Sequence, residues 1–375
     1  MDHHYDIAII GMGCAGGHVA LQLLEKAPDL KVAILDNYGA NSQEKTWSFW
    51  EKGTSKWDEI AMASWDHTSF HTGKKELLLD LAPYRYKSVK NVDFIAFAKA
   101  KLKQQPNFHF LPYEVVTTES GKDKSYIHHS NGSITAKILL DSRFDTSELE
   151  GTTLLQHFKG WFIQTADPAF DASRFTMMDY RMVDTGTTSF MYVLPFAQDK
   201  ALLEYTYFSK EKVSDETYES YINRYATEIL GIATFEILEV EQGVIPMSSH
   251  DFTQQNTNQY YRIGTAGGWV KASTGYSFKN AESKATQLVD NIINNRALSH
   301  KMHSKKYQVF DETLLRVLHE NNAVGPDVFS KMYERNNVQN ILSFLDEESN
   351  FTTELKIMKS LTSWTFVKNF FKSIF

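Results

Sequence analysis

Residues 1–36 combine two short apolar runs with an amphipathic segment between them. The runs cover residues 5–10 and 32–35, and the segment between them carries apolar side chains at helical spacing up to Pro28. Short apolar runs are typical of buried strands, apolar residues three and four positions apart are typical of helices, and proline ends a helix. The pattern therefore predicts a β-α-β unit at the start of the chain.

The rest of the chain changes its pattern several times. Asn131-Gly132 lies between two alternating runs, which is a strong signal for a β-hairpin. A second hairpin is predicted around Gln198-Asp199-Lys200, and its second strand places Leu202, Glu204 and Phe208 on one face. The other segments are predicted as loop at 37–60, short strands at 61–87, a helix at 92–102, a strand at 108–111, a strand-rich part at 155–250, a glycine-rich turn at 262–275 before a helix, and helices over 300–375.

The loop between the first strand and the first helix is rich in glycine. It has the sequence Gly11-Met12-Gly13-Cys14-Ala15-Gly16, and the second strand ends in Asp36, which is the dinucleotide-binding fingerprint in its expected context. Gly11 allows the tight turn, Gly13 lets the backbone approach a pyrophosphate, and Gly16 lets the helix pack on the strand. Asp36 can accept a hydrogen bond from a ribose hydroxyl. The phosphates would lie at the helix N-terminus, where free N–H groups and the helix dipole favour anions.

A second glycine-rich segment follows late in the chain, after residue 262. Together with the first turn and the strand-rich middle, it matches flavoprotein hydroxylase-type folds, in which a late turn closes on the pyrophosphate and the flavin of FAD. The spacing therefore predicts FAD rather than NAD, and no second complete nucleotide fold is expected for NAD(P)H. The late residues expected to bind the cofactor are Gly264, Gly267, Gly268, Thr274, Gly275 and Tyr276.

The expected fold class is α/β. A Rossmann-like, three-layer FAD-binding domain of the flavoprotein hydroxylase or glutathione-reductase type would carry an inserted strand-rich substrate domain and a helical C-terminal region. We expect the FAD-binding domain over residues 1–60, 88–145 and 255–299, the substrate domain over residues 61–87 and 146–254, and the helical region over residues 300–375.

Composition narrows the function classes. The net charge of −7 argues against a general nucleic-acid partner, and no GxSxG motif of hydrolases is present. The single cysteine, Cys14, permits no intrachain disulfide, and the histidines lack metal-binding spacing, so no metal site is expected.

We expect a reducing, cytoplasmic location, since the first strand leaves no room for a signal peptide and no apolar run is long enough to span a bilayer. An aromatic content of 13% fits either a large apolar ligand or a phenylalanine-rich core.

Glu204 is the titratable residue of greatest interest, because its predicted strand is otherwise apolar and aromatic. Burial disfavours the ionised form of a carboxyl group, which makes Glu204 a candidate proton donor. The alternative is a structural glutamate in a salt bridge. Asp179 and Arg181 form either a local ion pair that shapes the sheet or a support for a site, and Glu241 is a similar case.

Trp47, Phe49 and Trp50 lie in the segment predicted as loop. Tryptophans in a loop should be buried somewhere. A flavin, an apolar substrate or the protein core are the alternatives for what they contact.

Residues 353–375 are basic and aromatic. Their apolar positions form two stripes that are rotated against each other, which predicts two short amphipathic helices. Such helices can lie on a bilayer surface, so a peripheral membrane contact is expected, with packing on the body of the protein as the alternative. The stripes are Ile357, Met358, Leu361 and Trp364, and then Phe366, Val367, Phe370, Phe371 and Ile374.

Taken together, these motifs resemble the bacterial lycopene β-cyclase family over nearly the whole chain. The most specific blocks are Thr46-Trp47-Ser48-Phe49-Trp50 and residues 264–268 with Ser273-Thr274-Gly275-Tyr276. Further matching blocks cover residues 9–16, 178–181, 192–196, 203–206 and 245–247.

The resemblance implies an intramolecular lyase or isomerase of carotenoid biosynthesis that needs reduced FAD, takes electrons from NADPH and causes no net redox change. Family members convert the linear ψ-ends of lycopene to β-rings, giving γ-carotene and then β-carotene. An acid protonates the terminal double bond, the neighbouring alkene attacks the tertiary cation, and a base removes a ring proton. The acidic residue matching Glu204 is essential in the family, which makes Glu204 the general acid or the cation stabiliser.

Several alternatives stay open at this point. Reduced flavin could stabilise the cation or relay the proton. A FAD-dependent monooxygenase or an isoprenoid reductase acting on a hydrophobic substrate is the alternative enzyme, and a carotenoid or flavin carrier is the alternative without catalysis.

Overall fold

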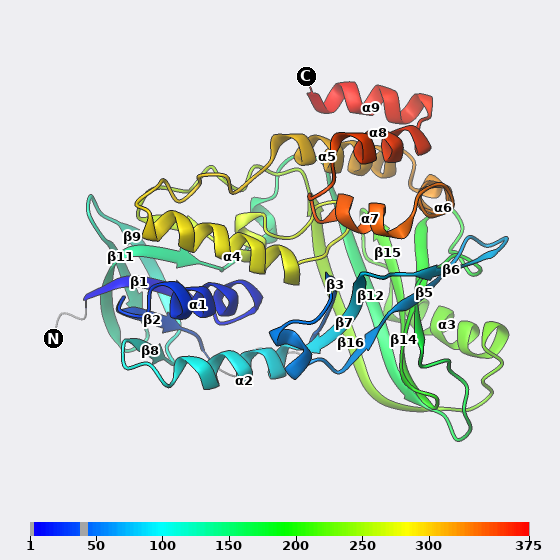
Figure 1. Ribbon diagram of the computed structural model, residues 1–375, viewed down its shortest axis with the longest axis horizontal. Helices are drawn as coiled ribbons and strands as arrows, with labels where there is room; N and C mark the ends of the chain where they lie inside the picture. Colours follow the sequence, from blue (N-terminus) through cyan, green and yellow to red (C-terminus); the bar gives the residue numbers. More distant parts are fainter. Residues whose placement is uncertain (1–3, 38–43, 375) are drawn as a thin grey trace.

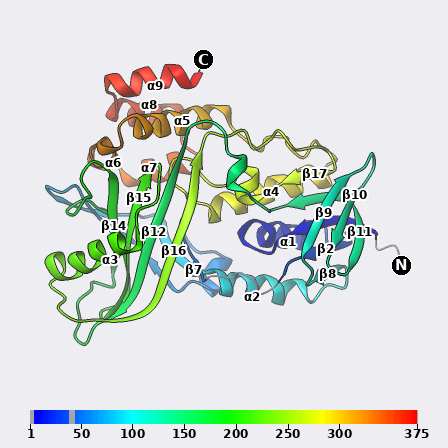
Figure 2. The same ribbon diagram turned by 180° about the vertical axis from the view of Figure 1, so that it is seen from behind.

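Two large sheets lie at opposite ends of the long axis of the molecule, and helices cover both (Figures 1 and 2). The structure is a computed structural model that describes residues 4–37 and 44–374. The described chain begins at the outer side of the first sheet and ends on the helical layer above the second sheet (Figure 1).

The first sheet has seven strands and contains the predicted β-α-β unit. Its strands are β1 His4–Ile10, β2 Val32–Leu35, β8 Phe108–Leu111, β9 Val115–Ser120, β10 Ser125–His129, β11 Gly132–Asp141 and β17 Tyr260–Arg262. Their order is β8-β2-β1-β11-β10-β9, with β17 paired to β11. The pairs between β8, β2, β1 and β11 are parallel, and β10 and β11 form the hairpin predicted at Asn131-Gly132.

Three helices cover one face of this sheet. They are α1 Cys14–Lys26, α2 Asn91–Leu102 and α4 Phe278–Ile293. Side chains such as Val19, Phe94 and Leu288 pack there against Ile7 and Ile9 of β1. On the opposite face, Ala8 and Ile10 of β1 form a second apolar cluster with Ile127 of β10 and Ile134 of β11, which belong to the same sheet. The predicted α/β class with a Rossmann-like sheet is confirmed.

The second sheet also has seven strands, in the order β16-β12-β15-β14-β13-β5-β6. Its strands are β5 His67–His71, β6 Glu76–Asp80, β12 Thr153–Gln164, β13 Arg174–Asp179, β14 Thr188–Ala197, β15 Lys200–Ser209 and β16 Glu236–Ser248. As predicted, side chains of β15 alternate between the two faces: Tyr205 packs toward helix α3 (Asp215–Arg224), and Leu202 and Phe208 pack toward the C-terminal helices.

The C-terminal region is helical, as predicted. It contains α5 Lys305–Glu320, α6 Gly325–Arg335, α7 Val338–Leu345, α8 Phe351–Ser360 and α9 Trp364–Ile374. The two amphipathic pieces predicted near the C-terminus are α8 and α9, separated at residues 361–363. Over the described residues, we find no helix with the length and apolar character needed to cross a bilayer.

A small sheet between the two large ones corrects the expectation of a loop over residues 37–60. Thr46–Lys52 is strand β3, which pairs with β7 (Tyr84–Lys90), and β7 also pairs with β4 (Ala63–Trp65). The loop prediction was wrong for this segment because a strand partner almost forty residues away gives no local signal. The domain boundaries stay a prediction, and the one expected between residues 87 and 88 falls within β7.

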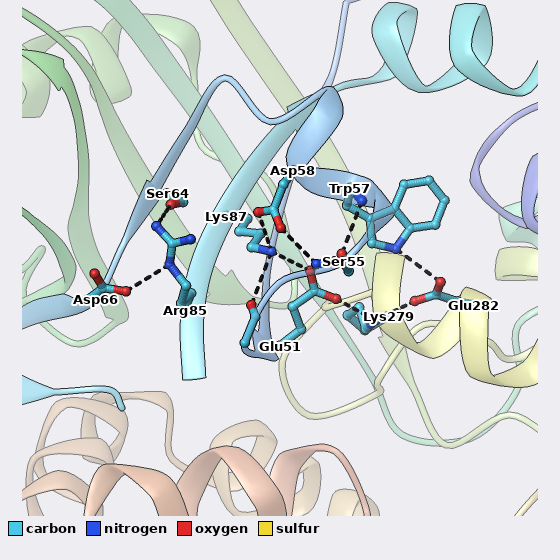
Figure 3. A network of polar contacts seen from close by, with 11 residues as sticks. Glu51, Ser55, Trp57, Asp58, Ser64, Asp66, Arg85, Lys87, Lys279 and Glu282 are labelled. Carbon is cyan, nitrogen blue, oxygen red and sulfur yellow. Dashed lines mark hydrogen bonds and ion pairs between the residues drawn. The ribbon is translucent and has the colours of Figure 1, made fainter. Parts of the chain in front are cut away.

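A buried network of charges joins the small sheet to α4 (Figure 3). Lys87 Nζ of β7 lies 2.7 Å from Glu51 and 2.6 Å from Asp58, and its side chain is fully buried. Lys279 of α4 contacts the other oxygen of Glu51 at 3.0 Å and also pairs with Glu282. These contacts hold β3 in place against the helix that follows the late glycine-rich segment.

Substitution of Lys87 by methionine is expected to lower the free energy of unfolding by about 3 kcal/mol, because buried Glu51 then keeps only the pair with the less buried Lys279. Chemical denaturation monitored by circular dichroism measures the change. Lys52→Met is the control, since Lys52 forms an exposed pair with Glu348 and should cost less than about 1 kcal/mol. Equal losses in the two variants would contradict a stabilising role for the network.

Candidate active site

The first glycine turn has the geometry that the fingerprint requires. Gly11 has a φ of +89°, which is the left-handed region that favours glycine. A Cβ atom on Gly16 would lie 1.9 Å from the carbonyl oxygen of Gly11 and 3.3 Å from Ile9. Gly16 is thus needed where α1 packs on β1. The space beside Gly13 is open, since no heavy atom of the described chain lies within 4 Å of an added Cβ.

The two glycine-rich segments meet although they are far apart in the sequence. A Cβ atom on Gly264 would lie 3.1 Å from the Cβ of Ala15. Between the segments is a cavity of about 770 Å³, which we call the glycine cavity. Of the residues that the sequence predicts to bind the cofactor, those that line this cavity are Gly13, Cys14, Ala15, Gly16, Asp36, Gly264 and Gly275.

In the glycine cavity, Asp36 has a fixed position and the Cys14 thiol is uncharged. The Asp36 carboxylate accepts the backbone N–H of Met12, which holds it at the cavity wall. Burial raises the pKa of the Cys14 thiol, so the thiol stays neutral at the start of α1. Gly267 and Gly268 are not among the described residues that line the cavity; they shape the turn behind it, where an added Cβ would meet Arg262 or Phe252.

The glycine cavity fits FAD by a second observation. Among the described residues, Trp269 Nε1 of the cavity wall lacks a hydrogen-bond partner, and so do Gln156 Oε1 and Thr274 Oγ1 beside Gly275, which lines the cavity. Buried polar groups are normally paired, so such atoms indicate the place of a polar ligand. With the open space at Gly13, they suit a pyrophosphate and a polar ring system.

Glu204 belongs to one transverse row of the second sheet. Strand register pairs Glu241 of β16 with Gly160 of β12, Gly160 with Glu204 of β15, and Glu204 with Tyr192 of β14. Opposite residues of antiparallel strands point to the same face. A Cβ on Gly160 would lie 3.2 Å from the Cβ of Glu204, so only the glycine leaves space between the two carboxyl side chains.

This row borders a chamber of about 140 Å³, which we call the glutamate chamber. Its walls are mainly apolar and aromatic. It shares Trp47, Glu241, Gly275 and other residues with the glycine cavity, so the two spaces adjoin. The aromatic residues of the wall are Trp47, Tyr86, Phe158, Phe190, Tyr192, Phe208, Tyr276, Phe278, Phe329 and Tyr333.

The chamber keeps Glu204 protonated at neutral pH. Burial, with a smaller contribution from the nearby Glu241, raises the pKa of Glu204 to about 8, although Thr206 donates a hydrogen bond to Glu204 Oε1 at 2.9 Å. Burial also raises the pKa of Glu241, whose carboxylate accepts the backbone N–H of Thr46 at 3.0 Å and its hydroxyl at 2.6 Å. A neutral carboxyl group in an apolar space can donate a proton.

Three tyrosine hydroxyls meet beside Glu204. Tyr86 Oη lies 2.8 Å from Tyr192 Oη and 3.2 Å from Tyr276 Oη. Burial raises the pKa of each of the three, so they stay neutral. They supply hydroxyl groups without charge to the chamber wall.

The three aromatic candidate residues of β3, Trp47, Phe49 and Trp50, do not all line the cavities. Trp47 lines both the glutamate chamber and the glycine cavity. Phe49 stacks on Phe278 at a centroid distance of 4.4 Å, and Trp50 makes an edge contact with Tyr276 at 4.4 Å. Phe49 and Trp50 thus lie behind residues of the chamber wall.

Asp179 and Arg181 lie at the end of β13 and outside the described lining of the glutamate chamber. Arg181 Nε donates to both Asp179 oxygens at 2.9 and 3.0 Å, and the Tyr225 hydroxyl donates to Asp179 at 2.7 Å. They form an ion pair between the buried Asp179 carboxylate and the exposed Arg181 guanidinium, and with Tyr225 the pair ties the end of β13 to the segment after α3. A supporting role for them in the site stays a prediction.

Sequence reasoning did not identify Gly160, Gln156 or the tyrosines at positions 86 and 192. Gly160 had a usable signal, because a glycine inside a strand often marks a close approach. Tyr192 had one as well, because it begins the block 192–196 that resembles the family. Gln156 and Tyr86 had none, since a strand glutamine and a buried tyrosine are common core residues.

The pKa of Glu204 predicts how the stability depends on pH. Its carboxyl has an ordinary pKa of 4.5 when unfolded and about 8 when folded, so the folded state binds more protons between these values. Stability should therefore decrease as the pH rises from about 4.5 to about 8, by up to about 5 kcal/mol for this group. Urea unfolding at several pH values measures this for the wild type and for Glu204→Gln, and parallel curves for the two proteins would contradict it.

The fold and the two glycine turns define a protein with the flavoprotein type of dinucleotide-binding fold. Solved structures with this fold include a geranylgeranyl bacteriochlorophyll reductase-like protein from Thermoplasma acidophilum, with 12% identity, full coverage of both chains and a TM-score of 0.64. A flavoprotein/dehydrogenase from Cytophaga hutchinsonii has 13% identity, 92% coverage of each chain and a TM-score of 0.62. The halogenase PltM in complex with phloroglucinol and FAD has 12% identity, covers 98% of this chain and 90% of its own, and has a TM-score of 0.60.

The chain belongs to the lycopene cyclase protein family, because the family model matches residues 6–369. It is 24% identical over 291 residues to the lycopene beta-cyclase of Paracoccus sp. (strain N81106 / MBIC 01143), which covers 75% of this chain and 72% of the relative. It is 22% identical over 302 residues to the lycopene beta-cyclase of Pantoea ananas, with 77% and 75% covered. The predictions of fold class and family are confirmed.

Proposed function

We propose that the protein is a lycopene β-cyclase that converts the ψ-ends of lycopene to β-rings without net redox change. The observation that carries this proposal is the position of Glu204. Its carboxyl group has a pKa of about 8 and borders an apolar chamber that adjoins the glycine cavity. Family membership supports the reaction class, an intramolecular lyase or isomerase that acts on a linear carotenoid.

The chemistry requires a proton donor and, later, a proton acceptor. Protonated Glu204 donates its proton to the terminal double bond, which leaves a tertiary cation and a carboxylate. The neighbouring alkene attacks the cation and closes the ring, and a carboxylate then removes one ring proton. Glu204 and Glu241 are the two carboxyl groups of the described chamber wall that can do this. The product is an isomer of the substrate, so no electrons are transferred overall.

The aromatic wall suits the positive charge of the intermediate. Faces of Trp, Tyr and Phe attract cations, with the largest effect in sites without water. Tyr192 lies directly opposite Glu204 in the sheet, and its hydroxyl stays neutral. The aromatic side chains therefore stabilise a cation without adding a charged nucleophile of their own.

The glycine cavity is proposed to hold FAD. The turn at residues 11–16 would receive the pyrophosphate, Asp36 the ribose, and the late segment the flavin side. Reduced FAD, with NADPH as the electron source, would supply negative charge near the cation or relay the proton. Trp47 and Gly275 line both spaces, so a flavin at this boundary would adjoin the glutamate chamber.

Expression in a lycopene-accumulating bacterium tests the proposal. We expect a colour change from red to orange-yellow, with γ-carotene and β-carotene identified by chromatography. Oxygen or hydride consumption in equal amount to a product would instead indicate a monooxygenase or an isoprenoid reductase. Unchanged lycopene in the presence of reduced FAD and lipid would contradict the cyclase proposal and favour a carrier.

Peripheral membrane contact through α9 is part of the proposal. Its outward side exposes Trp364, Phe371 and Ile374, with exposed fractions of 82%, 57% and 47%. Lys368 and Lys372, which contact Glu320 of α5, border this apolar side. Aromatic and basic residues in this arrangement favour the surface of a bilayer.

Replacement of both Trp364 and Phe371 by serine should weaken binding to anionic lipid vesicles at least about tenfold, because each buried aromatic contributes about 1.5–3 kcal/mol. Vesicle co-sedimentation measures the binding. Leu78→Ser is the control, because Leu78 of β6 is about as exposed as Phe371 and is distant from α9 in the sequence. This substitution should not change vesicle binding. Unchanged vesicle binding by the double variant would contradict membrane contact through α9.

A further inference from the structure

A third space lies among the C-terminal helices. It has a volume of about 440 Å³ and is bounded by residues of α5, α6, α7, α8 and α9; we call it the helical cavity. Its walls are formed mainly by Phe, Leu, Ile, Met and Val side chains. Asp311 also borders it, but its carboxylate is neutralised by Lys271 Nζ at 3.0 Å. An apolar space of this kind suits a hydrocarbon.

The helical cavity and the glutamate chamber share one wall. Thr274, Phe329, Met332 and Leu345 line both spaces. The glycine cavity adjoins the chamber through other residues, among them Trp47. The glutamate chamber therefore adjoins the glycine cavity through one set of wall residues and the apolar helical cavity through another.

Volume decides what the chamber alone can hold. An apolar cavity of about 150 Å³ takes a molecule of the size of benzene. The glutamate chamber, at about 140 Å³, has room for one six-membered ring and not for a long polyene. The remaining length of a linear carotenoid must lie elsewhere, and the adjoining apolar space is the helical cavity.

The helical cavity also reaches the protein surface at α8 and α9, the helices near the C-terminus. Leu355 of α8 and Val367 of α9 line it and are 54% and 37% exposed. The outward-facing Trp364 and Phe371 belong to the same helix as Val367. An apolar chain could thus pass from the exposed apolar side of α9 into the cavity without crossing water.

We propose that the helical cavity binds the polyene chain of a linear carotenoid while the reacting end lies in the glutamate chamber. This inference rests on the proposed function. It assigns α8 and α9 a role in substrate binding, in addition to membrane contact. The shared wall of Thr274, Phe329, Met332 and Leu345 is then the passage between chain and reacting end.

Tryptophan substitutions that fill the cavity test this proposal. Met358→Trp of α8 fills its interior, and Val367→Trp, at a partly exposed position, fills its mouth with less risk to folding. Lys356→Trp is the matched control, because Lys356 is exposed on α8 and is not among the described residues of the cavity wall. Thermal unfolding and flavin absorbance of each full-length variant show whether the fold and the cofactor are retained.

The first measurement is binding of diphenylhexatriene, a rod-shaped apolar polyene that fluoresces in apolar surroundings. Binding of this probe needs no catalytic turnover, so the measurement tests the helical cavity independently of the proposed function. We expect at least tenfold weaker binding by Met358→Trp and Val367→Trp, and wild-type binding by Lys356→Trp. Wild-type binding by both cavity variants would overturn the proposal.

The second measurement compares lycopene with a short acyclic terpene hydrocarbon that has the same terminal diene but no polyene. The cavity variants should lose at least tenfold in cyclisation of lycopene and retain cyclisation of the short substrate. Equal losses on both substrates, in folded protein with flavin bound, would overturn the assignment of the helical cavity. An inactive wild type with normal probe binding would contradict the proposed function instead.

Discussion

Replacement of Glu204 by glutamine is expected to reduce the cyclisation of lycopene by about 10²–10⁴-fold, which is the usual contribution of a positioned acid. Glutamine preserves the size of the side chain and can still accept a hydrogen bond from Thr206, but it has no proton to donate. FAD binding should stay at the wild-type level, because Glu204 lines the glutamate chamber and not the described wall of the glycine cavity. Chromatography of the pigments and flavin absorbance measure the two properties separately.

Glu241→Gln provides the comparison for this variant. Glu241 lines both the chamber and the glycine cavity and holds Thr46 of β3, so its loss should affect flavin binding as well as turnover. The wild-type rate should also decrease as the pH rises above about 8, because Glu204 then loses its proton. Cyclisation by Glu204→Gln at the wild-type rate would show that another group is the acid.

A pair of glycine substitutions should separate folding from cofactor binding. Gly16→Ala places a methyl group 1.9 Å from the backbone oxygen of Gly11, so α1 must shift from β1, at a cost of about 3 kcal/mol or more. Gly13→Ala meets no described heavy atom within 4 Å and should cost less than about 1 kcal/mol. Its methyl group nevertheless occupies the approach to the helix N-terminus, so flavin affinity should fall at least about tenfold.

Denaturation curves and flavin titrations of the two variants give both quantities. Gly53→Ala serves as a control for substitution of a surface glycine, because no described heavy atom lies within 4 Å of its added Cβ. Gly53 has a positive φ of +67°, so alanine should cause a small loss of stability there. Flavin affinity should not change. Wild-type flavin affinity in Gly13→Ala would contradict the placement of the pyrophosphate at this turn.

Local patterns predicted most of the elements that hold the site. The β-α-β unit, the hairpin of β14 and β15 and the helices of the C-terminal region all follow from short-range periodicity and turn residues. The segment Thr46–Lys52 did not, because its strand character comes from pairing with Tyr84–Lys90. Trp47 thereby reaches both cavities, whereas Phe49 and Trp50 lie behind them.

The sequence by itself determined the cofactor fingerprint, the alternation of β15 and the family, since each depends on residue types at short spacing. Only the tertiary structure decided that Glu204 and Glu241 face each other across Gly160, because strand register joins residues from three separate strands. It also decided that the raised pKa of Glu204 comes mainly from burial, and that the glutamate chamber adjoins both the glycine cavity and the helical cavity. Burial and enclosed space are properties of packed elements, and no single segment of the chain contains them.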